Sequence, residues 1–253
     1  MAIYDRPTRI IIKEMISELA PTHKMIFTKD DALYWFAKNY PKIKAGTISA
    51  HLIRFSVNAP SRLHYSPKID EDMLFQVDSG RFRLFEMESD GPPIHFKSDI
   101  TSNSENEIIE SEEFEVAHLN TFAYESDLKN FLAKNLTIIE PKLRLYKDEG
   151  ITGIEFPVDG RFIDILALDE ENNFVVIELK VSKGHERVIG QILRYMAWIK
   201  KNQADKDQKV RGVIVGREIS EDLKLACSYN PQISLFEYEL SVSLNKIEIN
   251  HIQ

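Results

Sequence analysis

The chain has 253 residues, 43% of them hydrophobic, which is enough for one large domain or two ordinary domains with real cores. Its net charge is −8, and its single cysteine, Cys227, excludes an internal disulfide and fits a reducing cytoplasm. No run approaches the roughly 20 apolar residues of a membrane span, and the N-terminus lacks a signal-peptide core. We therefore expect a cytoplasmic protein that has no membrane-spanning segment.

The first 90 residues predict three helices followed by a β-hairpin. Thr28 and the two aspartates after it offer an N-cap and an acidic first turn for the second helix. Alternation around Ser79-Gly80 predicts the hairpin. This order is typical of a winged helix-turn-helix, so we assign residues 1–90 to a winged-helix DNA-binding domain. The helices and the hairpin are expected over residues 7–19, 31–40, 44–58 and 73–86.

The third predicted helix is the candidate DNA reader. The N-terminal residues of such a helix lie nearest the bases, and residues 29–68 hold seven Lys or Arg against two Asp or Glu. Dimerisation or protein contact is the alternative use, because a fold does not determine a function. We expect base contacts from the N-terminal part of this helix, phosphate contacts from two arginines further along the chain and further contacts from the hairpin. In that order, the candidates are Lys44, Thr47, Ser49 and His51; Arg54 and Arg62; and Arg81 or Arg83.

Residues 91–120 predict an acidic linker. They hold one Lys or Arg against seven Asp or Glu and show little periodicity. The net charge is +1 for residues 1–90 and −3 for residues 121–253, so much of the acidity lies in this middle segment. Two domains joined by a linker are the natural interpretation.

Residues 121–253 predict an α/β domain with a mixed sheet flanked by helices. The runs RFIDILAL and FVVIELK are β-branched and apolar, and a polar turn separates them, which predicts a hairpin. Helical and strand patterns alternate around this hairpin. We expect helices over residues 124–136, 185–202 and 220–229, and strands over residues 161–168, 174–180, 210–216 and 233–244.

The predicted hairpin brings three charged side chains together. If the pairing is symmetric about Glu171, Asp164 lies opposite Glu178. Lys180 projects on the same side, since side chains alternate along a strand. A solvated edge strand with an ordinary salt bridge is the alternative. The apolar residues on both faces of the run 174–180 favour a buried central strand instead.

Such a charged cluster indicates a divalent metal site. Buried charges are costly unless they are paired or bind a cation, and two carboxylates with water and phosphate oxygens suit Mg²⁺, with Mn²⁺ as a substitute. Lys180 would then favour a metal-bound hydroxide and stabilise the charge that develops during phosphodiester hydrolysis. On the helix that follows, Gln191 and Tyr195 share a face and could hold a phosphate or the attacking water. Tyr195 could equally be a core residue whose hydroxyl is satisfied.

The ordered set GRFID, ELK and QILRY resembles the PD-(D/E)XK nuclease superfamily, in its GxxxD, ExK and QxxxY form. The sequence of residues 175–200 and 210–223 is similar to that of the catalytic domain of NucS/EndoMS-like endonucleases. The resemblance covers roughly residues 124–240. It implies a restriction-endonuclease-like sheet in residues 121–253. It also implies an additional acid at Glu125, although an acid in a first helical turn is favoured by the helix dipole anyway. The roles that it implies are metal ligands for Asp164 and Glu178, the catalytic lysine for Lys180, and an active-site helix pair for Gln191 and Tyr195.

These features together predict a Mg²⁺-dependent DNA endonuclease. A DNA-recognition domain and a cleavage domain in one chain fit a type II restriction-like enzyme acting on double-stranded DNA. The NucS-like resemblance suggests a repair enzyme for mismatched or branched DNA instead. A non-catalytic DNA-binding regulator is the third possibility. Cleavage of both strands needs two active centres, so we expect a homodimer.

Overall fold

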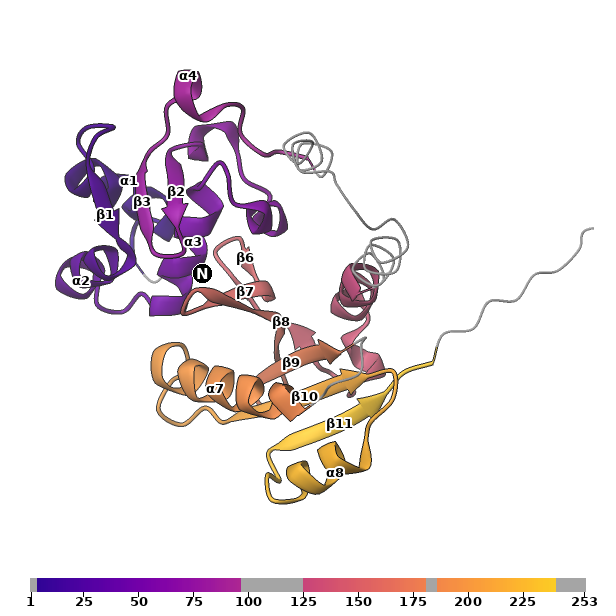
Figure 1. The fold of residues 1–253 in the computed structure, drawn as a ribbon. Coiled ribbons are helices and arrows are strands. Elements are labelled where there is room, and N and C mark those ends of the chain that lie inside the picture. The colour runs from indigo at the N-terminus through magenta and orange to yellow at the C-terminus, as the bar shows by residue number, and fades with distance from the viewer. Residues whose placement is uncertain (1–3, 97–124, 181–185, 240–253) are drawn as a thin grey trace, which may run out of the picture.

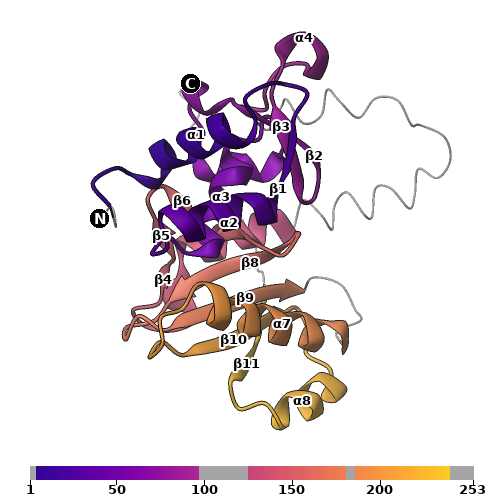
Figure 2. The same cartoon turned by 90° about the vertical axis from the view of Figure 1, so that its left-hand side faces the viewer.

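The computed structural model describes residues 4–96, 125–180 and 186–239. Residues 4–96 form the N-terminal unit, and the other two ranges form the C-terminal unit. In Figures 1 and 2 the N-terminal unit lies beside strands β7 (Ile154–Val158) and β8 (Arg161–Leu168). Strand β11 (Ile233–Glu237) lies at the far end of the sheet. None of the helices in the described part of the chain has both the length and the apolar character needed to cross a bilayer.

The N-terminal unit contains the three predicted helices and the predicted hairpin. A capping box between Thr28 and Asp31 begins the second helix, as the sequence indicates. A short strand, which the sequence analysis did not predict, precedes that helix and adds to the hairpin in the order β1-β3-β2. The elements are α1 (Thr8–Leu19), β1 (Ile26–Thr28), α2 (Lys29–Asn39), α3 (Ala45–Phe55), η1 (Pro60–Tyr65), η2 (Ile69–Glu71), β2 (Leu74–Asp78), β3 (Arg81–Leu84) and α4 (Met87–Asp90).

Six strands of the described C-terminal unit form one mixed sheet, which confirms the predicted fold class. Its order is β11-β10-β9-β8-β4, and β7 also pairs with β8. A helix over residues 125–134 precedes the sheet, and a two-stranded ribbon, β5 (Lys147–Asp148) and β6 (Ile151–Thr152), lies beside it. The remaining elements are η3 (Leu136–Ile138), β4 (Arg144–Leu145), β9 (Phe174–Lys180), α7 (Glu186–Asn202), β10 (Val210–Gly216) and α8 (Glu221–Ser228).

The hairpin β8–β9 has the predicted register. Leu168 pairs with Phe174 and Leu166 pairs with Val176, as symmetry about Glu171 requires. Strand β9 lies between β8 and a parallel β10, and six of its seven residues are buried. It is therefore the central strand that the apolar pattern indicates.

Helices cover both faces of this sheet and create two cores. On one face α7 and α8 pack with Phe174 and Val176, which we call the α7 core. On the other face the helix over residues 125–134 packs with Val175 and Ile177, which we call the helix-125 core. This division follows from the alternation of side chains along β9.

The N-terminal unit packs directly on the α7 core. Ala50 and Ile53 of α3, together with Tyr65 of η1, are buried in the same cluster as Tyr146 and Phe156. The α3 helix can approach this closely because its second residue is Gly46, where a Cβ atom would lie 2.8 Å from the Phe156 ring. The two units therefore share apolar surface, whereas most of the predicted linker lies outside the described residues. The division at residues 90 and 121 stays a prediction.

Candidate active site

Asp164 and Glu178 meet where β8 and β9 lie side by side. The regular pairing of the two strands ends at Ile165 and Ile177, one step before these carboxylates. Oδ2 of Asp164 then accepts a hydrogen bond from the backbone amide of Leu179 over 2.9 Å. Lys180 places Nζ 3.6 Å from Oε2 of Glu178. The structure thus brings together the three charged side chains that the hairpin register predicts.

Helix α7 contributes Gln191 and Tyr195 to the same place. Nε2 of Gln191 donates to Oε2 of Glu178 over 2.9 Å and lies 3.3 Å from the Tyr195 hydroxyl. Tyr195 is 2% exposed, so most of its ring is core and only the hydroxyl reaches the polar cluster. Both predicted descriptions of Tyr195, core residue and neighbour of the charged site, therefore apply.

Burial makes the carboxyl groups of Glu178 and Asp164 weaker acids than usual. Desolvation, followed by repulsion from Asp164, raises the pKa of Glu178 to about 8, although Lys180 opposes the shift. Desolvation also raises the pKa of Asp164, against the hydrogen bond from Leu179 and the charges of Lys129 and Lys180. Without a bound cation, the lysines nearby do not fully compensate the negative charges that Glu178 and Asp164 would carry when ionised. A bound metal ion would lower both pKa values by favouring the ionised forms.

The donor set fits a hard divalent cation. Glu178 is 1% exposed, yet its Oε1 atom has no hydrogen-bond partner among the described residues. An orphaned carboxylate oxygen beside a second carboxylate is what an oxygen-preferring ion such as Mg²⁺ would satisfy. No group of three or more His, Cys, Asp or Glu in the described ranges has metal-binding geometry. Protein ligation here would come from Asp164 and Glu178, and water or substrate would complete the shell.

Glu125 lies near this site, at the start of the helix over residues 125–134. Desolvation and then the charge of Asp164 raise the pKa of Glu125, so the two carboxylates sense each other. Lys129, one turn further along, lowers it. The structure therefore places Glu125 close enough to Asp164 for their charges to interact. Lys129 stabilises the ionised forms of both carboxylates.

Glu155 and Lys129 are two site residues that the sequence analysis did not identify. Nζ of Lys129 lies 2.6 Å from Oε1 of Glu155 on β7, and both charges act on Asp164. The segment before Gly160 contains a proline and lacks strict alternation, so it carries no strand signal. Gly160 itself has φ of 74° in the two-residue β7–β8 turn, where Asp159 is also left-handed. Such hairpin turns favour glycine, which explains the glycine of the GxxxD motif.

The predicted base-contacting residues of α3 face the C-terminal unit instead of solvent. Thr47 donates to Asp148 over 2.9 Å, and Lys44 pairs with Asp205 over 2.8 Å. His51 is fully buried, and burial followed by the charge of Arg54 lowers its pKa to about 3. Ser49 is also buried and donates to the carbonyl of Ala45. We therefore correct the prediction for α3, because packing between the units covers the face that a DNA groove would need.

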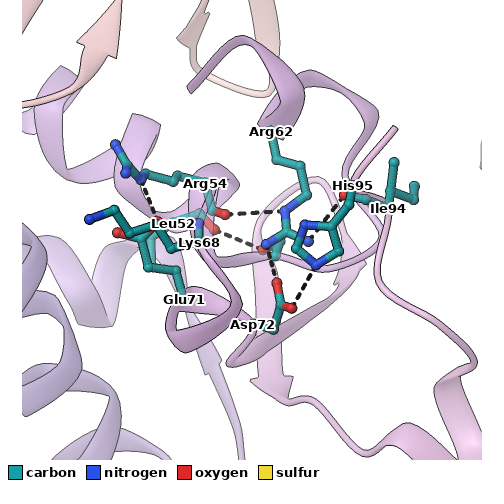
Figure 3. A network of polar contacts seen from close by, with 9 residues as sticks. Leu52, Arg54, Arg62, Lys68, Glu71, Asp72, Ile94 and His95 are labelled. Carbon is teal, nitrogen blue, oxygen red and sulfur yellow. Dashed lines mark hydrogen bonds and ion pairs between the residues drawn. The ribbon is translucent and has the colours of Figure 1, made fainter. Parts of the chain in front are cut away.

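Arg54 and Arg62 also have internal partners, as Figure 3 shows. Nε of Arg54 lies 2.9 Å from Oε2 of Glu71, and both side chains are buried. Arg62 is fully buried and pairs with Asp72 over 2.5 Å, and His95 contacts the other oxygen of Asp72. The predicted phosphate contacts of these arginines are thus corrected as well, because desolvated ion pairs hold both guanidinium groups.

The hairpin arginines are more accessible. Arg81 is exposed and pairs with Asp78 in the same hairpin over 2.6 Å. Arg83 is partly buried, lies 4.4 Å from the centroid of the Phe75 ring and pairs with Asp90. Of the two side chains, that of Arg81 is the more exposed and hence the more accessible to DNA phosphates.

Comparison with known proteins separates the two units. Residues 7–84 match the family described as a domain of unknown function, DUF7669, and residues 124–233 match the Endonuclease NucS C-terminal domain. The chain therefore contains a NucS-like C-terminal domain, which confirms the resemblance to NucS/EndoMS endonucleases. The PD-(D/E)XK superfamily is consistent with that assignment.

Individual relatives match the same part of the chain. Endonuclease NucS of Pyrococcus abyssi is 26% identical over 101 residues, which are 40% of this chain and 36% of that protein. Endonuclease NucS of Methanocaldococcus jannaschii is 30% identical over 104 residues, with the same two shares. The match thus spans about a third of the length of these relatives.

Solved structures with a similar arrangement include a repair endonuclease from Pyrococcus abyssi and EndoMS in apo form. The first has a TM-score of 0.37 at 23% identity and covers 53% of this chain and 49% of that one. The second has a TM-score of 0.38 at 20% identity and covers 47% of each chain.

Proposed function

We propose that this protein is a divalent-metal-dependent DNA endonuclease of the repair type, which hydrolyses phosphodiester bonds at mismatched or branched DNA. The observation that carries the proposal is the cluster of Asp164, Glu178 and Lys180 in a NucS-like domain, with an orphaned oxygen on Glu178. Mg²⁺ is the proposed metal and Mn²⁺ the proposed substitute, because both prefer oxygen ligands.

Each residue has a proposed part in the reaction. Asp164 and Glu178 would hold the metal, which would supply Lewis-acid stabilisation of the phosphate and a more acidic bound water. Lys180 lies beside Glu178, where its ammonium group stabilises the negative charge of the transition state. Gln191 orients Glu178 through its hydrogen bond.

A repair enzyme is favoured over a restriction-like one by the position of α3. Reading a specific sequence would need the α3 side chains in a DNA groove, and Thr47 and His51 are buried. Exposed arginines on β8 and α7, two of the elements that carry site residues, offer phosphate contacts, which fit recognition of DNA shape more than of bases. They are Arg161 on β8 and Arg187 and Arg194 on α7.

The test is incubation of the full chain with three substrates: intact plasmid, mismatched duplex and branched duplex. Cleavage of the mismatched or branched DNA with Mg²⁺, and none with EDTA, is the expected result. Discrete fragments from intact plasmid would support the restriction-like alternative. DNA binding with no cleavage under any divalent metal would support the non-catalytic regulator. Sedimentation with and without DNA tests the proposed homodimer.

A matched pair of variants connects the activity to this site. Glu178→Ala removes a metal ligand and should abolish cleavage while DNA binding persists. Glu170→Ala removes a carboxylate from the exposed turn between β8 and β9, where it pairs with Lys142, and should cleave like the wild type. Cleavage that survives in Glu178→Ala places the active centre elsewhere.

A further inference from the structure

Glu155 has an unusual backbone conformation next to the candidate metal site. Its φ is 48°, although β7 is otherwise extended around it. The flanking pairs join Ile154 to Ile165 and Phe156 to Ile163, which leaves Glu155 opposite Asp164. Left-handed backbone at a non-glycine residue is strained and persists only where the surroundings hold it. Glu155 is therefore held in place beside a proposed metal ligand.

Both strands change faces at this point. Ile154 and Ile165 pack in the helix-125 core, whereas Phe156 and Ile163 pack in the α7 core. Residues two apart in a regular strand would share one face. The left-handed backbone at Glu155 therefore re-aims its side chain, although the register of β7 and β8 stays one-to-one across this point.

Groups from two separate elements, the helix over residues 125–134 and η1, hold Glu155. Lys129 donates to Oε1 over 2.6 Å, and Ser61 of η1 donates to Oε2 over 2.5 Å. His64 of η1 lies 3.4 Å from Oε2, and the Tyr65 hydroxyl donates to the Glu155 carbonyl over 3.2 Å. Burial opposes ionisation of Glu155, but the bonds from His64, Lys129 and Ser61 outweigh it and hold its pKa well below the usual range. Glu155 is thus a fixed negative charge.

The fixed charge matters because of where Lys129 lies. The Lys129 side chain is 11% exposed, and its charge acts on both Asp164 and Glu125. Its ion pair within the described ranges is with Glu155. A flexible ammonium group released from that pair has two further carboxylates near it: Asp164, a proposed metal ligand, and Glu125, which lies near the site.

We propose that Glu155 is a positioning residue that holds the Lys129 ammonium group away from Asp164, so that Asp164 stays available to a divalent cation. Without Glu155, Lys129 pairs with Asp164 and competes with the metal for the same oxygens. Because Ser61 and His64 belong to the N-terminal unit, that unit helps to set the metal affinity of the C-terminal site. This inference rests on the proposed function.

The test is Mn²⁺ binding to the full chain without DNA, measured by titration calorimetry on four proteins. They are the wild type, Glu155→Gln, Lys129→Met and the double variant. Glu155→Gln should bind Mn²⁺ about 10-fold to 100-fold more weakly, the range for outer-shell partners of metal ligands. Adding Lys129→Met to Glu155→Gln should restore most of the affinity, because the competing cation is then gone. Such a rescue would show that Lys129 competes with the metal ion for Asp164. If Glu155→Gln merely damaged the structure, a second substitution would weaken Mn²⁺ binding further.

Two controls keep the outcome decisive. Glu170→Gln breaks an exposed ion pair with Lys142 and should bind Mn²⁺ like the wild type. If Glu155→Gln does not fold, as judged by circular dichroism, Ser61→Ala replaces it, since it removes one hydrogen bond to Glu155 without changing charge. Wild-type affinity in Glu155→Gln, or a double variant no better than the single one, overturns the inference. A wild type that binds no Mn²⁺ overturns the proposed function instead.

Discussion

The side-chain amide of Gln191 donates a hydrogen bond to Oε2 of Glu178 over 2.9 Å, so α7 orients a carboxylate that belongs to β9. Lys180 lies 3.6 Å from the same oxygen. The other oxygen, Oε1, has no hydrogen-bond partner in the described part of the chain. The two oxygens of one carboxylate therefore have separate tasks: Oε2 is held by the protein and Oε1 is available to a cation.

Removal of the Gln191 amide should weaken metal binding. Gln191→Leu keeps the helix and the side-chain bulk but frees Oε2, so Glu178 loses its fixed orientation. We expect affinity for Mn²⁺ to fall about 10-fold to 100-fold, as for other outer-shell partners, which calorimetry would measure. Tyr195→Phe is the control, because its hydroxyl accepts a hydrogen bond from Gln191 over 3.3 Å and, in the described part of the chain, has no hydrogen bond to Glu178. An equal loss in both variants would mean that general packing around α7, not the amide, orients Glu178.

Metal-induced stabilisation should increase with pH. The pKa of Glu178 is raised to about 8 in the folded protein, so without metal its contribution to stability is lost as pH rises from the usual glutamate range through about 8. Metal ligation requires the ionised carboxylate. The increase in Tm caused by saturating Mg²⁺ should therefore be larger at about pH 8.5 than at about pH 6. Scanning calorimetry measures both values, and Glu178→Gln should flatten the dependence on pH.

Arg62 should matter for stability and not for DNA. Arg62→Ala leaves the partly buried Asp72 without its guanidinium partner and with only the His95 contact, and breaking a buried pair costs about 3–5 kcal/mol. Denaturant unfolding should show that loss, while DNA affinity measured below the unfolding transition stays close to that of the wild type. A stable Arg62→Ala protein with greatly weakened DNA binding would contradict the buried arrangement in Figure 3.

Arg194 should behave in the opposite way. It is exposed on α7, with its guanidinium carbon 5.4 Å from the centroid of the Tyr195 ring and hence close to the candidate site. If it contacts phosphate, Arg194→Ala weakens binding to all DNA sequences alike and reduces the slope of log affinity against log salt by about 1. Binding titrations at several salt concentrations measure the slope. Arg144→Ala is the matched control, because Arg144 is exposed on β4 and pairs with Leu168, at the end of β8 that is remote from the candidate site.

Gly46 should be sensitive to a single methyl group. A Cβ atom there would lie 2.4 Å from Oε1 of Gln203 and 2.8 Å from the Phe156 ring, both in the C-terminal unit. Overpacking of this kind costs about 1–3 kcal/mol, so Gly46→Ala should lower the free energy of unfolding. In contrast, Gly190 in α7 has nothing within 4 Å of its Cβ position. Gly190→Ala should stabilise the protein by about 0.5–1 kcal/mol, because alanine is the better helix former.

Local patterns accounted for much of the C-terminal domain. Strand β8 spans Arg161–Leu168 and β9 spans Phe174–Lys180, as the apolar runs predict. The register follows from the polar turn, and the register brings Asp164 and Glu178 together. In the same way, the N-cap at Thr28 and the acidic residues after it predicted where α2 begins, and the structure forms a capping box there. In each case the interacting residues are close in sequence, so short-range periodicity is sufficient to predict the contact.

The remaining part of the site depends on contacts between distant segments. Periodicity indicates that α3 is amphipathic, but it does not show whether DNA or another part of the chain covers the polar side. Thr47 meets Asp148 and Lys44 meets Asp205, more than 100 residues away in each case. Glu155 likewise has its partners on η1 and on the helix over residues 125–134. Burial and ion pairing depend on which surfaces meet when the two units pack, and no local pattern contains that information.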